Sequence, residues 1–162
     1  MKRWDLRPFE IRNLFNPAFC GLVLFRALSA YEEEDPRGMP FSLTLLVLPL
    51  CLQKDARDTL SRASRSYFLK TIAAHPQMLM DFPKNSTDLL PFTLEGLGLL
   101  MQLGTISVDR DGRLKASPVG VRKTISGTPE TIACQRVARY LGREFAQIGD
   151  RATVYTTLGV RP

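Results

Sequence analysis

Residues 86–117 place the strongest constraint on how this chain can fold. Within this segment Pro91 is suited to the first turn of a helix, and Gly104 to the left-handed residue that ends one. Asp111-Gly112 is a preferred turn between two antiparallel strands. The segment therefore predicts a turn, a helix and then a tight hairpin, whose strands are 105–109 and 113–117.

The helix in this segment lacks the side chains that read DNA. From Phe92 to Leu103 the only charged residue is Glu95, and the only amide side chain is Gln102. Base reading in the major groove uses Arg, Lys, Asn or Gln, and phosphate contact uses cations. The segment thus has the outline of a winged helix, but its helix is suited to burial or to docking on a protein. The candidate docking residues on it are Phe92, Glu95 and Leu99.

Length and composition indicate one domain with its own core. A chain of 162 residues can bury a sizeable core, and 44% hydrophobic with 23% charged residues excludes global disorder. We expect a mostly α protein with a small β-hairpin wing (α+β), folded as a winged-helix-like single domain. Its parts are a helical N-terminal part (1–75), a winged-helix-like part (76–120) and C-terminal helices (128–158).

A long apolar helix is predicted near the N-terminus. Asn16 can accept hydrogen bonds from the amides of a first turn, and Pro17 arrives with a helical φ. Nearly every position from Ala18 to Tyr31 is apolar, so most faces of this helix must be covered and it belongs at the centre of the fold. The acidic run 32–35 suits the negative end of a helix dipole poorly, and we expect it to form a solvated loop.

Prolines mark further helix boundaries. His75-Pro76 ends a helix because the residue before a proline avoids the α region. Pro91 marks another start, so a helix at 76–90 is expected to be separate from the one that ends at Gly104. The other expected helices are a short buried one at 41–53, for which a strand is the alternative, and those at 57–62, 66–74, 128–149 and 151–158.

No membrane span is predicted. The longest apolar run, Phe41–Leu52, has 12 residues, whereas a span needs about 20. The first residues lack the continuous apolar core of a signal peptide. We therefore expect a cytoplasmic protein with no membrane partner. The widely spaced cysteines, which have apolar neighbours, are expected to be buried reduced thiols: Cys20, Cys51 and Cys134.

Positive charge is concentrated in the last third of the chain. From residue 110 onward ten basic residues stand against four acidic ones, which accounts for the whole net charge of +6. Three cations lie in the predicted hairpin, and three more are spaced to share one face of the following helix. They are either a solvated surface or contacts for an acidic partner or for double-stranded DNA phosphates, without base reading. These candidates are Arg110, Arg113, Lys115, Arg136, Arg139 and Arg143.

No pattern of catalytic residues stands out. His75 is the only histidine, and it precedes a proline. Gly96 and Gly98 lie inside a predicted helix with no strand before them, so they do not form a dinucleotide-binding loop. They instead allow another backbone or a partner side chain to come close. We therefore predict a non-enzymatic protein with no cofactor and no metal ion.

Four segments together resemble the middle component of bacterial three-component ABC systems. These small proteins are encoded beside an SMC-like ABC ATPase and an effector protein, in loci of the Lamassu type that act against phages and plasmids. The resemblance implies a winged-helix-like adaptor that binds the ATPase and the effector in a DNA-sensing defence complex. None of the motifs is catalytic. The segments are Asn13–Cys20, Gly38–Phe41, Leu90–Thr93 and Ala152–Pro162.

The C-terminal tail and the function each leave an alternative open. The end of the chain, Leu158–Pro162, is either a docking tail or a strap that closes the core. Its candidate partner-docking residues, with the helix before it, are Tyr155, Val160 and Arg161. The alternative function is a winged-helix DNA-binding transcriptional regulator. That function requires sequence-specific contacts, which a helix without cations supplies poorly.

Overall fold

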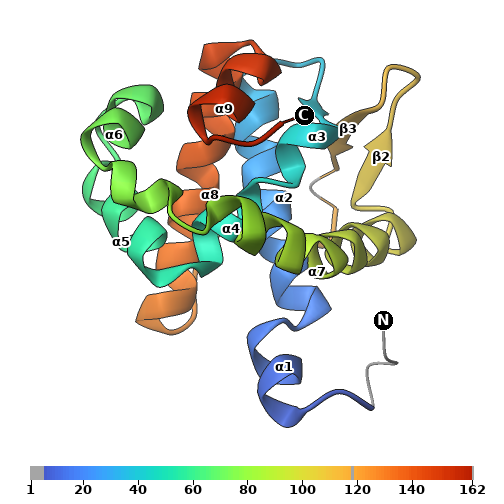
Figure 1. Ribbon diagram of the computed structural model, residues 1–162. Coiled ribbons are helices and arrows are strands. Elements are labelled where there is room, and N and C mark those ends of the chain that lie inside the picture. Colours follow the sequence, from blue (N-terminus) through green and yellow to red (C-terminus); the bar gives the residue numbers. More distant parts are fainter. Residues whose placement is uncertain (1–5, 118, 162) are drawn as a thin grey trace.

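The computed structural model describes residues 6–117 and 119–161. Helices dominate, and a small antiparallel sheet lies at one side (Figure 1), which confirms the predicted fold class. A 3-10 turn spans Pro76–Leu79. The helices are α1 (Phe9–Leu14), α2 (Pro17–Glu34), α3 (Phe41–Thr44), α4 (Val47–Leu52), α5 (Lys54–Arg62), α6 (Phe68–Ala74), α7 (Phe82–Gln102), α8 (Pro129–Ile148) and α9 (Arg151–Thr157), and the strands are β1 (Met39–Pro40), β2 (Ile106–Val108) and β3 (Arg113–Ala116).

The long helix α2 forms the centre of the fold. The Asn16 side chain accepts a hydrogen bond from the Ala18 amide at 2.8 Å, and Pro17 is the first helical residue, as the sequence predicts. Figure 1 shows α8 running beside α2 and α7 crossing it. Because these two helices cover α2, almost all of its residues from 20 to 31 are buried.

The acidic end of α2 is helical, and the expectation of a solvated loop there is wrong. The helix continues through Glu34. The Glu32 carboxylate accepts a hydrogen bond from the Ala116 amide at 2.8 Å. Asp35 pairs with Arg37 at 2.9 Å, and this contact holds the pKa of the Asp35 carboxyl below its ordinary value. These partners offset the unfavourable placement of carboxylates at the negative end of a helix.

Two glycines bring α7 and α8 into close contact with α2. A Cβ atom on Gly96 of α7 would lie 3.0 Å from the Gly21 nitrogen. One on Gly142 of α8 would lie 3.0 Å from the Tyr31 nitrogen, and closer still to the carbonyl oxygen of Ala27. Larger side chains at these positions would push the helices apart. The prediction that Gly96 admits another backbone is therefore confirmed.

The helix break predicted at Pro91 is wrong. α7 runs from Phe82 to Gln102 with Pro91 in its interior, and the expected helix 76–90 is replaced by the 3-10 turn and the first half of α7. An interior proline costs about 3 kcal/mol. Burial of the inner face of α7, which includes Leu97 and Leu100, offsets that cost. The turn and separate second helix of the winged-helix outline are consequently not formed at this point.

The apolar segment 41–53 folds into two short helices, where the sequence predicted one. α3 ends at Thr44 and α4 begins at Val47, with Pro49 inside α4. The segment is buried as expected, since Leu43 and every residue from 46 to 51 are buried. The strand alternative for this segment is not observed.

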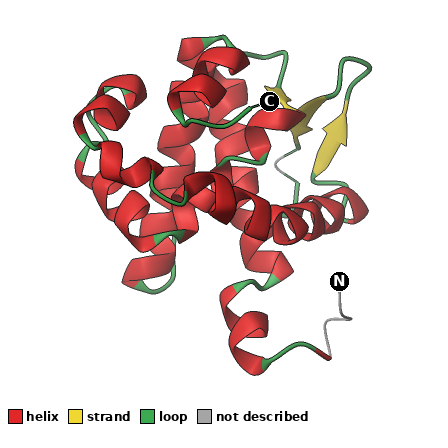
Figure 2. Ribbon diagram, viewed as in Figure 1, coloured by secondary structure: helices red, strands yellow, loops and turns green. Residues whose placement is uncertain are grey.

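The predicted hairpin is present, and a third strand extends it. β3 lies between β1 and β2 in an antiparallel sheet (Figure 2). The turn has Gly112 at φ 71°, and the Asp109 carboxylate accepts a hydrogen bond from the Arg113 amide at 2.9 Å. The sequence did not predict β1, in which Met39 pairs opposite Leu114.

The C-terminal helices begin and end close to the predicted positions. The Thr128 hydroxyl oxygen accepts a hydrogen bond from the Thr131 amide at 3.3 Å, and Gly149, at φ 69°, ends α8. Asp150 caps α9 by accepting from the Thr153 amide at 2.9 Å. The buried cluster draws side chains from α2, α4, α7, α8, α9 and the strands.

Candidate protein-docking surface and basic faces

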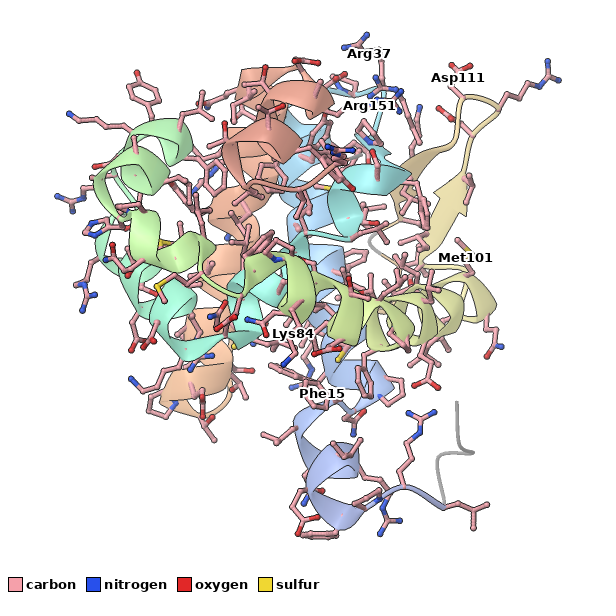
Figure 3. All side chains as sticks on the ribbon, viewed as in Figure 1. Phe15, Arg37, Lys84, Met101, Asp111 and Arg151 are labelled. Atoms are coloured by element: carbon pink, nitrogen blue, oxygen red, sulfur yellow. The ribbon has the colours of Figure 1, made fainter. Side chains whose placement is uncertain are left out.

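One exposed side of the C-terminal half of α7, from Leu90 to Met101, is apolar and carries no charge. Leu90, Leu94 and Met101 are 37%, 47% and 42% exposed, and their spacing of four and seven residues places them on one side of the helix. Gly98 lies on the same side, and among the described residues no heavy atom beyond the adjacent helix backbone and chain neighbours comes within 4 Å of the position its Cβ would take. Met101 lies at the end of α7 nearest the hairpin (Figure 3). We call Leu90, Leu94, Gly98 and Met101 the α7 outer face.

An N-terminal arm, residues 6–15, lies against α7. The Phe15 and Phe92 rings stack with centroids 4.4 Å apart and an interplanar angle of 25°. The Arg7 guanidinium makes a bidentate contact with the Glu95 carboxylate, in which Nη1 donates to Oε2 at 2.7 Å. The single charge of the segment 92–103 is therefore compensated within the chain. The arm itself exposes Leu6, Phe9 and Leu14 by 66%, 66% and 62%.

The docking residues predicted on α7 are placed mainly under neighbouring groups. Phe92 is half-buried beneath Phe15, and Glu95 is paired with Arg7. Leu99 is half-buried and lines a cavity of about 320 Å³ between α2, α7 and the loop before α8. Sequence reasoning missed Leu90, Leu94 and Met101, whose shared face is visible in the sequence only when the helix continues through Pro91.

The C-terminal candidates are also largely covered. Tyr155 is buried, and its hydroxyl donates a hydrogen bond to the Ser42 carbonyl oxygen at 2.7 Å. Val160 is half-buried and packs on the core, whereas Arg161 is exposed. These contacts support the strap interpretation for residues up to 160. Partner contact through Arg161 stays a prediction.

The basic residues of the hairpin do not form one free patch. Arg113 donates to the Gly38 carbonyl oxygen at 2.7 Å and lies 3.8 Å from the Asp35 carboxylate, so it holds the hairpin against the end of α2. Lys115 is half-buried. Arg110 is exposed near the hairpin tip, which projects from the body in Figure 3.

The three arginines of α8 differ in exposure, and two of them border different cavities. Arg136 and Arg143 are exposed, and Arg136 borders a cavity of about 250 Å³ beside Leu60 of α5. Arg139 is half-buried and lines a different cavity, which also includes Ala116 of β3. Of these three arginines the structure therefore leaves Arg136 and Arg143 accessible, seven residues apart on one face.

The groups that could carry metal or nucleophilic chemistry are dispersed or buried. Within residues 6–117 and 119–161, no three His, Cys, Asp or Glu side chains are close enough to hold a metal ion. The ring of His75 lies 3.3 Å from the Gln77 side chain through its Nδ1 atom. The cysteines are buried as expected, and burial raises the pKa of the Cys20 thiol to about 12. A thiol with so high a pKa stays protonated and acts as a packing group.

The apolar composition of the N-terminal helices is explained by their position in the fold. The stretch Phe9–Glu34 is long and apolar enough to cross a membrane by length and composition, and it includes α1 and α2. More than half of its most apolar window is buried inside the molecule, where α2 contacts α7 and α8. A core helix in that position needs apolar side chains on most faces. The expected lack of a membrane partner stays a prediction.

Comparison with known proteins identifies a family but no individual relative. No curated protein and no solved structure matches the chain. The winged-helix identity therefore stays a prediction. A family match extends over residues 4–162, nearly the whole sequence. The chain belongs to the family of Middle Component 3 of the ABC-three component (ABC-3C) systems.

Proposed function

We propose that this middle component is a non-enzymatic adaptor subunit that holds an SMC-like ABC ATPase and an effector in one DNA-sensing defence complex of the Lamassu type. Family membership supports a role as one component among several. The proposed adaptor role goes further and rests on the surface of α7. Its partners are the ATPase and the effector, with non-specific double-stranded DNA as a contact of the assembled complex.

The observation that carries this proposal is the uncharged outer face of α7. Leu94 and Met101 are each more than 40% exposed, and no charged side chain lies between them along that face. The centres of protein interfaces are depleted in charge and enriched in Met and aromatic residues. The adjoining arm adds Phe9 and Leu14 to the exposed apolar area. A partner that covers these side chains gains about 25 cal/mol for each Å² of apolar surface removed from water.

The test is co-purification with the ATPase encoded beside this chain. Leu94→Glu with Met101→Glu places two carboxylates on the α7 outer face, where partner contact would have to desolvate them. We expect this double variant to weaken the complex by about a hundredfold or more, because two such losses cost several kcal/mol. Binding is measured by titration of the purified chain onto the immobilised ATPase.

Lys84→Glu is the matched control for that experiment. It is an exposed position on α7 and also makes the net charge more negative by two, but it lies outside the outer face. Its binding should equal that of the unchanged chain. An equal loss in the two variants would assign the effect to net charge, and a wild-type chain that fails to bind the ATPase at low salt would exclude the adaptor role.

We propose that the accessible arginines of α8 supply the DNA contact within the complex. Arg136 and Arg143 are exposed on one face, and phosphate contacts by such cations make binding depend on salt. Arg136→Gln with Arg143→Gln should lower the slope of log K against log salt for duplex binding by about 2, roughly 0.9 for each lost phosphate contact. An unchanged slope would show that these two side chains are solvated surface only.

The alternative of a sequence-specific transcriptional regulator gains no support from α7. Its outer face presents Leu90, Leu94, Gly98 and Met101, none of which donates a hydrogen bond to a base edge. The regulator function would be favoured over the adaptor role if the chain protected one fixed DNA sequence in a footprinting experiment and if Leu94→Glu abolished that protection.

A further inference from the structure

A cavity of about 470 Å³ lies between α2, α8, β3 and the loop before α8. Its volume falls within the range of small-ligand sites, which is about 300 to 1,000 Å³. Phe25, Val121 and Ala116 give it apolar walls. The remaining lining is strongly charged, with three cations and two carboxylates: Arg26, Lys123, Arg139, Glu32 and Glu33.

Arg26 is a buried cation without a carboxylate partner. It is only 6% exposed, and no carboxylate of residues 6–117 and 119–161 forms an ion pair with its guanidinium. Nε donates to Gln135 Oε1 at 3.2 Å, and the two Nη atoms donate to the Lys123 and Thr124 carbonyl oxygens at 3.3 Å each. These bonds use three of the five donors of a guanidinium. A buried charge compensated only by neutral dipoles is costly, and an anion nearby would reduce that cost.

Arg139 adds a second positive charge to the same cavity. It is half-buried, and within the described part of the chain its guanidinium has neither an ion pair nor a hydrogen bond. Burial and the nearby Arg139 together lower the pKa of Arg26. Two arginines therefore line one cavity, and within the described residues neither is paired with a carboxylate. Paired guanidiniums of this kind are suited to recognising a phosphate dianion.

The opposite end of the cavity differs in charge. Arg26, Ser29 and Glu33 follow one another along one side of α2, so the Cα atoms of Arg26 and Glu33 stand about 10 Å apart along the helix axis, given a rise of 1.5 Å per residue. Glu32 already accepts one hydrogen bond from Ala116, and a carboxylate can accept several. A ligand that fits must be anionic at one end, apolar in the middle, and a hydrogen-bond donor at the other end.

We propose that this cavity binds the phosphate ester of a small organic molecule, with the phosphate on Arg26 and Arg139, the body against Phe25 and Val121, and N–H or O–H donors of the body on Glu32 and Glu33. Ribonucleoside monophosphates have this combination of groups and serve as the probes. The site is separate from the α7 outer face, so its test does not depend on the adaptor role.

The test is isothermal titration of the purified full-length chain with the four ribonucleoside monophosphates and phenyl phosphate. At least one ester should bind, while the matching nucleoside and inorganic phosphate each bind at least about tenfold more weakly, because each lacks part of the contact set. Arg139→Gln should weaken the ester by about tenfold or more, the effect of one charge-assisted hydrogen bond. Arg151→Gln, which removes the same charge from an exposed position on α9, should leave binding unchanged.

A second variant protects the test against a folding failure. Arg139→Lys keeps the charge but loses the planar donor fork, and it should show a smaller loss than Arg139→Gln. Thermal unfolding of each variant checks that the fold is intact. The proposal is overturned if none of the five esters binds the folded chain, or if Arg139→Gln and Arg151→Gln lose affinity equally. It is also overturned if Arg139→Gln weakens association with the ATPase but does not change ester binding, because the cavity would then hold a carboxylate of the partner.

Discussion

Gly142 on α8 and Gly98 on α7 both lie inside long helices, but their surroundings are opposite. Gly142 faces the backbone of α2 at Ala27 and Tyr31, whereas Gly98 faces open space on the α7 outer face. The missing side chain is required by packing at the first position, and no contact among the described residues requires it at the second. The contrast separates the part of the molecule that determines the fold from the part that is free to meet a partner.

The largest effect is expected for Gly142→Ala. The added methyl group would overlap the Ala27 carbonyl oxygen and would lie 3.0 Å from the Tyr31 nitrogen, so α2 and α8 must move apart. Overpacking of this kind against backbone atoms destabilises by about 3 kcal/mol. Urea denaturation followed by circular dichroism measures the change in the free energy of unfolding. A loss under about 1 kcal/mol would mean that the α2–α8 contact tolerates separation and is not the rigid centre of the fold.

The sequence predicted the ends of the central helices because those ends are determined by local chemistry. Asn16 and Thr128 satisfy first-turn amides with their own side chains, and Gly149 adopts the left-handed conformation that ends α8. The Asp109–Gly112 turn is equally local, since its hydrogen bonds join residues at most four positions apart. None of these features depends on what the rest of the chain contacts.

The features that were missed depend on contacts distant in sequence. Pro91 was expected to break a helix, but burial of α7 against α2 keeps the helix continuous, and only a continuous α7 aligns Leu90 with Leu94 and Met101. Arg139 was grouped with Arg136 by spacing, and it is α2 that covers one side of α8 and separates them. A periodic pattern identifies which residues share a helix face, but it does not show where a neighbouring helix divides that face.

An intermediate effect is expected where the arm meets α7. Phe15→Ala removes the stacked ring on Phe92, and an aromatic pair of this kind contributes about 1 kcal/mol beyond its buried area. The loss should be local, because α1 buries none of its own residues. We expect faster amide hydrogen exchange in residues 9–14 and little change in α8. Leu14→Ala, at a position 62% exposed, is the control and should leave exchange in the arm unchanged. Equal protection in Phe15→Ala would indicate that the Arg7–Glu95 contact alone holds the arm.

The smallest effect, and the opposite sign, is expected for Gly98→Ala. Alanine stabilises a helix relative to glycine by about 0.5 to 1 kcal/mol where it fits, and the Cβ position of half-buried Gly98 lies in open space. Urea denaturation should therefore show a more stable chain, in contrast to Gly142→Ala. A less stable chain would mean that Gly98 is packed.

Binding of the same variant to the proposed ATPase partner distinguishes two ways of using the outer face. Weaker binding would show that the partner backbone approaches α7 at Gly98, because only a close backbone approach is sensitive to one methyl group. Unchanged binding would place the contact on Leu94 and Met101.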